Sequence, residues 1–157
     1  MSHNVKNFAP LPQIGTQSTL SRTITEEDIL LFAQASGDRN PIHLDPEYAE
    51  RTIFGKRIAH GFLTGSLISS VLGNDLPGPG AIYLEQTLKF LAPVYIGDTI
   101  TVKVEVVALR EDKRIVILQT DCTNQSNTLV LTGQATMKHM KEAGAPTDER
   151  KAESQGR

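Results

Sequence analysis

The chain has 157 residues, the size of one ordinary domain, and its 16 basic and 18 acidic side chains give a net charge of −2. This balance leaves no basic excess for binding nucleic acid. A single cysteine, Cys122, rules out an internal disulfide framework and any metal site built from several cysteines, and it is typical of a reducing compartment. With no basic and apolar leader and no long apolar run, we expect a cytoplasmic protein that does not contact a membrane.

The first part of the chain predicts one strand and two helices. Residues 16–24 have the apolar spacing of a strand. A helix should begin after Thr25, a good N-cap residue, because acidic residues fill the first turn and Gly37 provides a stop. A second, shorter helix should follow Asp45, since the next residue is a proline, which is favoured in a first helical turn.

The second part predicts one apolar helix and four strands. Residues 61–73, GFLTGSLISSVLG, carry no charge and are apolar or small on every face, which indicates a helix surrounded by protein. Strands are expected at 81–92, 99–110, 114–124 and 127–139. Such a helix next to antiparallel strands favours an α+β fold in which a curved sheet wraps the helix.

The expected sheet also has consequences for assembly and boundaries. One sheet around one helix leaves strand edges and a face uncovered, and dimerisation would cover them. Residues 141–157 have no periodicity and almost no large apolar side chain. We therefore expect a single domain over residues 1–140, followed by a disordered charged tail.

Two chemically capable side chains, Asp38 and His43, flank Asn40-Pro41 between the first two helices. Asp38 follows a helix C-terminus, where the helix dipole disfavours a negative charge, and this suits a carboxyl group that exchanges protons. Pro41 should keep the segment extended and limit how far the imidazole moves from Asp38. The pair could hold one water molecule. Asp-x4-His alone is a weak signal, and a turn-capping aspartate with an ordinary loop histidine is the alternative.

A second candidate site is His60-Gly61, which opens the apolar helix. The first N–H groups of a helix have no partner within it, so the Gly61 amide could bind an oxyanion. Alternatively, Gly61 only lets helix and sheet touch, and His60 is a capping or core residue. Ser66 and Ser69 lie on the same helix without a Gly-x-Ser-x-Gly elbow, which argues against a serine nucleophile. The sequence predicts no metal or nucleotide site.

Three stretches carry a family resemblance: FAQASGDRNPIHLDPEYA, IAHGFLTGSLISSVL and YLEQTLKFLAPVYIGDTITVKVEV. Over residues 16–139 the chain resembles the MaoC-like (R)-specific enoyl-CoA hydratases. The resemblance implies a hot-dog fold, in which an antiparallel sheet wraps a central helix, and a homodimer that binds acyl-CoA along the subunit interface. It implies reversible hydration of trans-2-enoyl-CoA to (R)-3-hydroxyacyl-CoA without a cofactor, in fatty acid metabolism or polyhydroxyalkanoate precursor supply.

The resemblance also implies roles for individual residues. Asp38 and His43 would be the catalytic pair, and the Gly61 N–H would bind the thioester oxygen. Four residues would bind the substrate or support its pocket: Gly61, His60, Asn40 and Ser69. Which member of the catalytic pair is the base stays open, because coupled groups share their titration.

Other functions on the same fold are also compatible with the residues. An acyl-CoA thioesterase could direct the activated water at the carbonyl carbon, although its catalytic acid is expected on the central helix, where residues 61–73 contain none. A hydroxyacyl dehydratase acting on acyl carrier protein would differ mainly in the carrier. A non-catalytic acyl-binding module would have no need of both Asp38 and His43.

Overall fold

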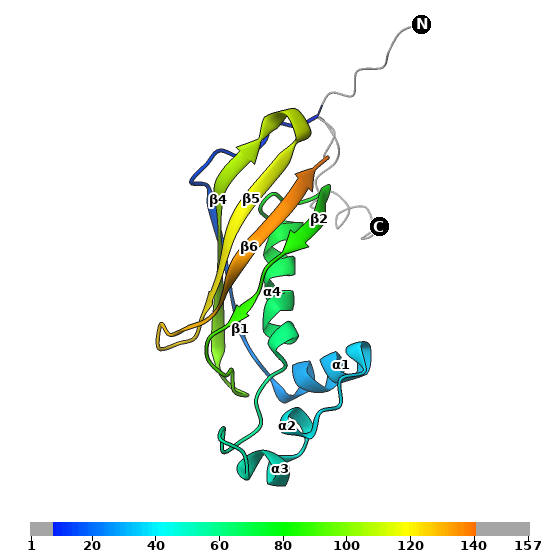
Figure 1. The fold of residues 1–157 in the computed structure, drawn as a ribbon, viewed down its shortest axis with the longest axis vertical. Coiled ribbons are helices and arrows are strands. Elements are labelled where there is room, and N and C mark those ends of the chain that lie inside the picture. The colour runs from blue at the N-terminus through cyan, green and yellow to red at the C-terminus, as the bar shows by residue number, and fades with distance from the viewer. Residues whose placement is uncertain (1–7, 141–157) are drawn as a thin grey trace, which may run out of the picture.

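The computed structural model describes residues 8–140, in which an antiparallel sheet wraps one long helix (Figure 1). The strands are β1 (Gln17–Thr23), β2 (Ala81–Gln86), β3 (Lys89–Phe90), β4 (Thr99–Arg110), β5 (Ile115–Thr123) and β6 (Leu129–His139). The helices are α1 (Glu26–Ser36), α2 (Pro41–Leu44), α3 (Pro46–Glu50) and α4 (Gly61–Asn74). The sheet order is β1-β4-β5-β6-β2, and β3 pairs with β6.

The hydrophobic core lies between α4 and the face of the sheet that curves around it (Figure 1). Along β4, Val102, Val104 and Val106 are completely buried, while the residues between them lie on the outer face. This is the alternation that the sequence predicts for this strand. On α4, Ile68 and Leu72 are completely buried in the same cluster.

Helix α1 begins and ends where its capping residues predict. The Thr25 hydroxyl accepts a hydrogen bond from the Asp28 N–H at 3.1 Å, and the Asp28 carboxylate accepts one from the Thr25 N–H at 2.9 Å. This reciprocal pair is a capping box. At the other end Gly37 adopts a left-handed conformation with φ +78°, which side chains with a Cβ rarely adopt. The chain therefore leaves the helix at Asp38, whose backbone oxygen lies 3.1 Å from the Nε2 of His60, the residue before α4.

The segment 81–92 is not the single strand that the sequence predicts. Its register on β6 shifts between Tyr83 and Glu85, and pairing is interrupted between β2 and β3. At the interruption the Thr87 backbone lies so close to Gly133 that a Cβ there would be 1.8 Å from the Thr87 oxygen. The segment bulges at this point and its backbone packs closely against Gly133. The apolar pattern of the sequence does not reveal such a contact.

Helix α4 is also less enclosed than its apolar sequence predicts. Its buried residues face the sheet, whereas Phe62 is 67% exposed and Ser66 and Ser69 lie on the same open side. At one edge of the sheet, β2 exposes Ile82 and Leu84 at 50% and 52%. A single chain therefore leaves an apolar helix face and an apolar edge strand uncovered.

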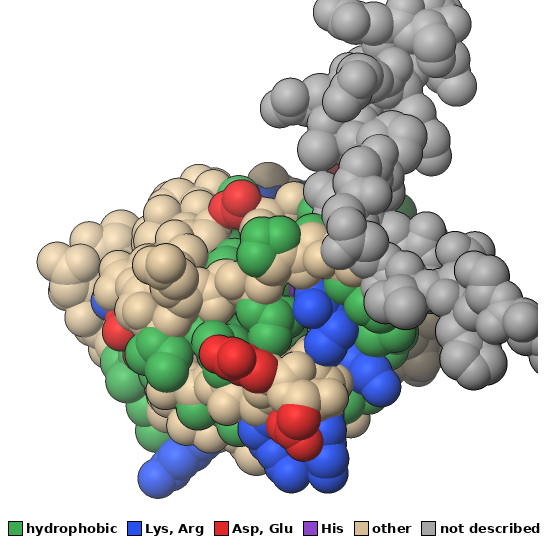
Figure 2. Space-filling model, turned by 90° about the horizontal axis from the view of Figure 1, so that it is seen from above, with side chains coloured by type: hydrophobic (Ala, Val, Ile, Leu, Met, Phe, Trp, Pro, Cys, Tyr) green, Lys and Arg blue, Asp and Glu red, His purple; other side chains and the backbone are tan. Residues whose placement is uncertain are grey.

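The remaining surface carries charges of both signs. Seen from the end opposite α1–α3, acidic and basic side chains are interspersed with apolar ones (Figure 2). Within residues 8–140, no helix has the length and apolar character needed to cross a membrane. The predicted tail, residues 141–157, lies outside the described residues.

Candidate active site

The loop after α1 contains a short helix where an extended segment was predicted. Asn40 has an extended backbone with φ −54° and ψ 125°, and Pro41 is the first residue of α2. The Asn40 side-chain oxygen accepts a hydrogen bond from the Ile42 N–H at 3.2 Å and so caps this helix. The prediction was wrong because proline disfavours the helical conformation only in the residue before it, and is itself well suited to a first helical position.

Helix α2 places His43 in its final turn, with the side chain 8% exposed. The His43 Nδ1 lies 2.8 Å from the Ile58 carbonyl oxygen. Because a carbonyl oxygen only accepts, Nδ1 carries the hydrogen in the neutral ring, and Nε2 is left as the acceptor. His43 therefore presents a lone pair to its surroundings and has an orientation fixed by the backbone.

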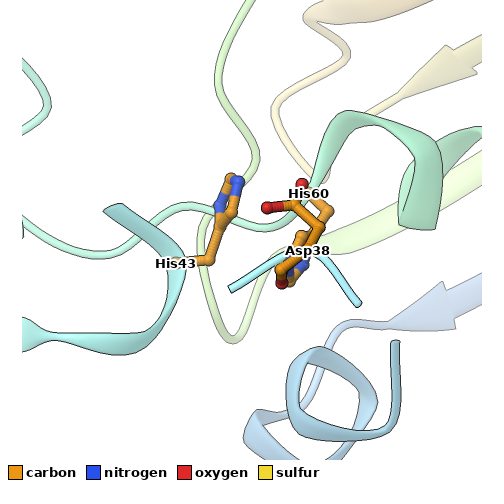
Figure 3. Close-up of side chains that lie close together, drawn as sticks. All are labelled: Asp38, His43 and His60. Carbon is orange, nitrogen blue, oxygen red and sulfur yellow. The ribbon is translucent and has the colours of Figure 1, made fainter. Parts of the chain in front are cut away.

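The Asp38 carboxylate lies close to that imidazole. Asp38 is exposed, and its Oδ1 accepts a hydrogen bond from the Asn40 N–H at 3.1 Å, which orients the side chain. Figure 3 shows the carboxylate turned toward the ring of His43. One potential ligand atom from each of Asp38, His43 and His60 lies within 4.8 Å of the other two. Two acceptors this close can share one water molecule, which donates a hydrogen bond to each.

Two histidines and a carboxylate are also common metal ligands. The rings of His43 and His60, however, stack with their centroids 3.9 Å apart and their planes inclined by 31°. A metal ion lies near the plane of each imidazole that binds it, whereas the planes of these two rings lie one above the other. One ring would have to turn before both could bind one ion, so the arrangement suits a bound water better than a metal centre.

His60 packs against His43 and is only 2% exposed. Its ring is packed between His43 and Phe32, whose centroid is 4.9 Å away. The Nε2 atom is 3.1 Å from the Asp38 backbone oxygen, so Nε2 is the protonated nitrogen. Burial lowers the pKa of His60, and the nearby His43 adds to this, while the contacts with Asp38 oppose it. The ring is therefore a buried neutral imidazole.

Gly61 and His43 line one cavity of about 470 Å³. Its walls are mainly apolar and come from the loop before α4, from α4 itself, and from β3 and the segment after it. The residues facing it include Phe54, Ile58, Phe62, Phe90, Leu91, Val94, Val130 and Leu131. Gly61 is the first residue of α4, so its N–H is one of the helix donors without an intrahelical partner. A positive helix end thus meets an imidazole acceptor in an apolar enclosure.

Not every residue predicted for the site joins it in this chain. Asp38, His43, His60 and Gly61 come together, and Asn40 caps the helix that carries His43. Ser69 instead lies on the exposed side of α4, in a second hollow that shares Phe62 and Phe90 with the first. Neither Asp38 nor His60 lines the cavity; Asp38 is exposed beside His43, whereas the burial of His60 argues against contact with a substrate.

Two residues that the sequence reasoning missed also shape the cavity. Phe90 lies against Gly61, so that a Cβ on Gly61 would be 2.7 Å from the Phe90 Cε1 atom. Thr64 lines the cavity and is buried, and within residues 8–140 its hydroxyl oxygen and the His60 Nδ1 are the two buried side-chain polar atoms without a hydrogen-bond partner. A polar residue on the buried side of an apolar helix, four residues after His60, was a signal available in the sequence.

Comparison with known proteins identifies the family, because the family model described as "MaoC like domain" matches residues 8–128. The chain belongs to the MaoC-like family. This MaoC-like chain is 50% identical over 123 residues to the (R)-specific enoyl-CoA hydratase of Rhodospirillum rubrum, covering 78% of this chain and 85% of that protein. It is 49% identical over 126 residues to the 3-hydroxybutyryl-CoA dehydratase of Methylorubrum extorquens, covering 80% of each.

A solved structure agrees with this membership. The (R)-hydratase from Aeromonas caviae, described as involved in polyhydroxyalkanoate biosynthesis, matches this MaoC-like chain with a TM-score of 0.81 and 45% identity. The match covers 84% of this chain and 100% of that one. The family resemblance and the α+β hot-dog fold predicted from the sequence are thereby confirmed.

Proposed function

We propose that this protein catalyses the reversible hydration of trans-2-enoyl-CoA to (R)-3-hydroxyacyl-CoA. One observation carries the proposal: His43, whose imidazole lies beside the Asp38 carboxylate, lines the same apolar cavity as Gly61, the first residue of α4. The relatives reported above have names that state the same kind of reaction, in the forward or reverse direction. Hydration forms a C–O bond at Cβ and a C–H bond at Cα as an O–H bond and the C=C π bond break, with no net oxidation or reduction, so the reaction needs no redox cofactor.

The cavity suits an acyl thioester. Its apolar walls would bind the acyl chain, and the thioester oxygen would accept a hydrogen bond from the Gly61 N–H. Attack of water at Cβ moves negative charge onto that oxygen, because the conjugated system becomes an enolate. A preorganised amide donor of this kind contributes about 2.7–4 kcal/mol to transition-state stabilisation.

The catalytic pair would position and deprotonate the water. The His43 Nε2 and the Asp38 carboxylate each accept a hydrogen bond from it, which places its oxygen against Cβ. As the oxygen–Cβ bond forms, one proton passes to a member of the pair, and this proton is then delivered to Cα of the enolate. The second proton stays on the new hydroxyl group, so the enzyme returns to its starting state.

Stereochemistry would follow from the same arrangement. The water is held on one side, and the Gly61 amide orients the thioester, so only one face of Cβ is open to attack. Both new bonds form on that face because the same pair handles the water and the Cα proton. The geometry supports selectivity, and the names of the (R)-specific relatives support the (R) product.

We further propose that the working form is a homodimer. A second copy would cover the open side of α4, where Phe62 is exposed, and the apolar edge of β2 at Ile82 and Leu84. The two hollows that share Phe62 and Phe90 would then lie at the interface, where a long acyl chain could be enclosed. Ser69 would join the substrate site only in such an assembly.

We place this reaction in the cytoplasm, in fatty acid metabolism or the supply of polyhydroxyalkanoate precursors. The second of these roles is supported by the description of the Aeromonas caviae enzyme as involved in polyhydroxyalkanoate biosynthesis. The compartment is supported by Cys122, which is the single cysteine of the chain and is completely buried.

Crotonyl-CoA provides the direct test. The enoyl-thioester absorbance should fall with no release of free thiol, which separates hydration from thioester cleavage. The product should give no NADH with an (S)-specific 3-hydroxyacyl-CoA dehydrogenase. Thiol release would establish a thioesterase instead, and stoichiometric NADH would show the opposite enantiomer.

A further inference from the structure

His60 occupies the N-cap position of α4 but makes no side-chain capping bond. The residues favoured at this position are serine, threonine, aspartate and asparagine, whose oxygen accepts a hydrogen bond from an N–H of the first turn. Such an oxygen would accept from the Phe62 or Leu63 N–H and would stand beside the Gly61 N–H, where the thioester oxygen is proposed to bind. The imidazole makes no such bond and does not cover this end of α4, so the chain forgoes a stabilising cap at this point.

The ring instead reaches the catalytic loop. The His60 Nε2–H donates to the backbone carbonyl oxygen of Asp38 at 3.1 Å, across 22 residues of sequence. The carbonyl belongs to the residue whose carboxylate lies beside His43. One hydrogen bond therefore joins the loop that would hold the water to the residue that precedes the proposed thioester donor.

The surroundings hold this ring in one orientation and one protonation state. It is stacked on His43 and packed against Phe32, with almost no exposure to solvent. Its Nδ1 is buried with no hydrogen-bond partner, which suits a lone pair far better than a second N–H. Turning the ring over would put a carbon in the place of Nε2, which would break the bond to Asp38 and leave the buried N–H without that partner.

We propose that His60 is a positioning residue, which as a neutral Nε2–H imidazole holds the Asp38 loop at a set distance from the start of α4. This inference rests on the proposed function, since the two parts it joins are the water-holding pair and the thioester donor. Losing the bond would displace the Asp38 carboxylate from His43 and from the bound thioester. The predicted consequence is a lower kcat with little change in KM, because the walls of the acyl cavity would be unaltered.

Two substitutions of His60 separate positioning from simple space filling. In His60→Gln the amide nitrogen takes the place of Nε2 and can still donate to Asp38. In His60→Asn it takes the place of Nδ1 and is too short to reach that carbonyl, although asparagine is a good N-cap. With the full chain and crotonyl-CoA, we expect His60→Asn to lower kcat by ~10- to 100-fold in protein that thermal unfolding shows to be folded at the assay temperature, and His60→Gln to stay within ~5-fold of the wild type.

A second readout is independent of turnover. The ¹⁵N spectrum of histidine-labelled wild-type protein should show His60 with a protonated Nε2 and an unprotonated Nδ1, assigned by its loss in His60→Gln. The proposal is overturned if the ring is the opposite tautomer or doubly protonated, if both variants lose activity equally, or if His60→Asn keeps normal kcat. If the wild type does not hydrate crotonyl-CoA, the proposed function fails, and the spectrum still decides the state of His60.

Discussion

Replacing Gly61 by proline should remove the amide donor proposed for the thioester oxygen and leave α4 intact. Proline is well tolerated at the first position of a helix, where its missing N–H has no intrahelical partner to lose. It also requires an extended conformation of the preceding residue, and His60 already has φ −58° and ψ 135°. Gly61→Pro is therefore a deletion of one N–H at a position whose backbone accepts it.

Gly61→Ala is the matched control, because alanine keeps the N–H and adds the same Cβ. That atom would lie 2.7 Å from Cε1 and 3.0 Å from Cδ1 of Phe90, so the aromatic ring has to move in both variants. Phe90 is 49% exposed and can turn toward solvent without opening the core. The Cβ contact with Phe90 is thus common to both substitutions, and their difference reports the loss of the N–H together with the pyrrolidine Cδ that replaces its hydrogen.

The expected difference follows from the role of one oxyanion donor. Removing such a donor lowers kcat by about 10²- to 10³-fold, or about 2.7–4 kcal/mol of transition-state stabilisation. We expect Gly61→Pro to fall by this factor below Gly61→Ala, measured from the loss of enoyl absorbance with crotonyl-CoA. Thermal unfolding of both variants checks that the fold is kept. Equal kcat values in two folded variants would refute the assignment of the Gly61 amide.

Three further tests address the proposed catalytic pair of Asp38 and His43, the proposed dimer and the buried hydroxyl of Thr64. Asp38→Asn and His43→Ala should each lower kcat at least ~100-fold in a folded protein, and near-normal turnover in either would remove the proposed pair. The wild type should sediment as a dimer. Leu84→Glu should shift the protein toward monomer, because a charge would enter the proposed apolar contact between the two copies. A monomer with full activity would contradict the proposed dimer. Thr64→Val should leave the free energy of unfolding unchanged or raise it by about 1 kcal/mol, because the hydroxyl is buried without a partner. A loss above ~2 kcal/mol on chemical denaturation would show that the hydroxyl is bonded.

Local signals in the sequence were sufficient for much of the fold. Thr25 and Gly37 predict the bounds of α1 because capping and left-handed turns depend on a few neighbouring residues. The alternation along β4 predicts its buried face for the same reason. Pro41 shows the limit of such local signals. A proline disfavours a helical conformation in the residue before it but can itself begin a helix, and contacts with the rest of the protein decide whether a helix follows.

By itself, the sequence determined which chemical groups are present and placed Asp38 near His43, because only four residues of chain separate them. It also determined that Gly61 begins an apolar helix, and hence that a free amide lies there. Only the tertiary structure decided that His60 turns its Nε2 toward the Asp38 carbonyl, and that Phe90 lies against Gly61. These contacts join residues far apart in the chain. They depend on how the sheet curves around α4 and on where β3 pairs with β6, and the spacing of neighbouring residues in the sequence does not determine either.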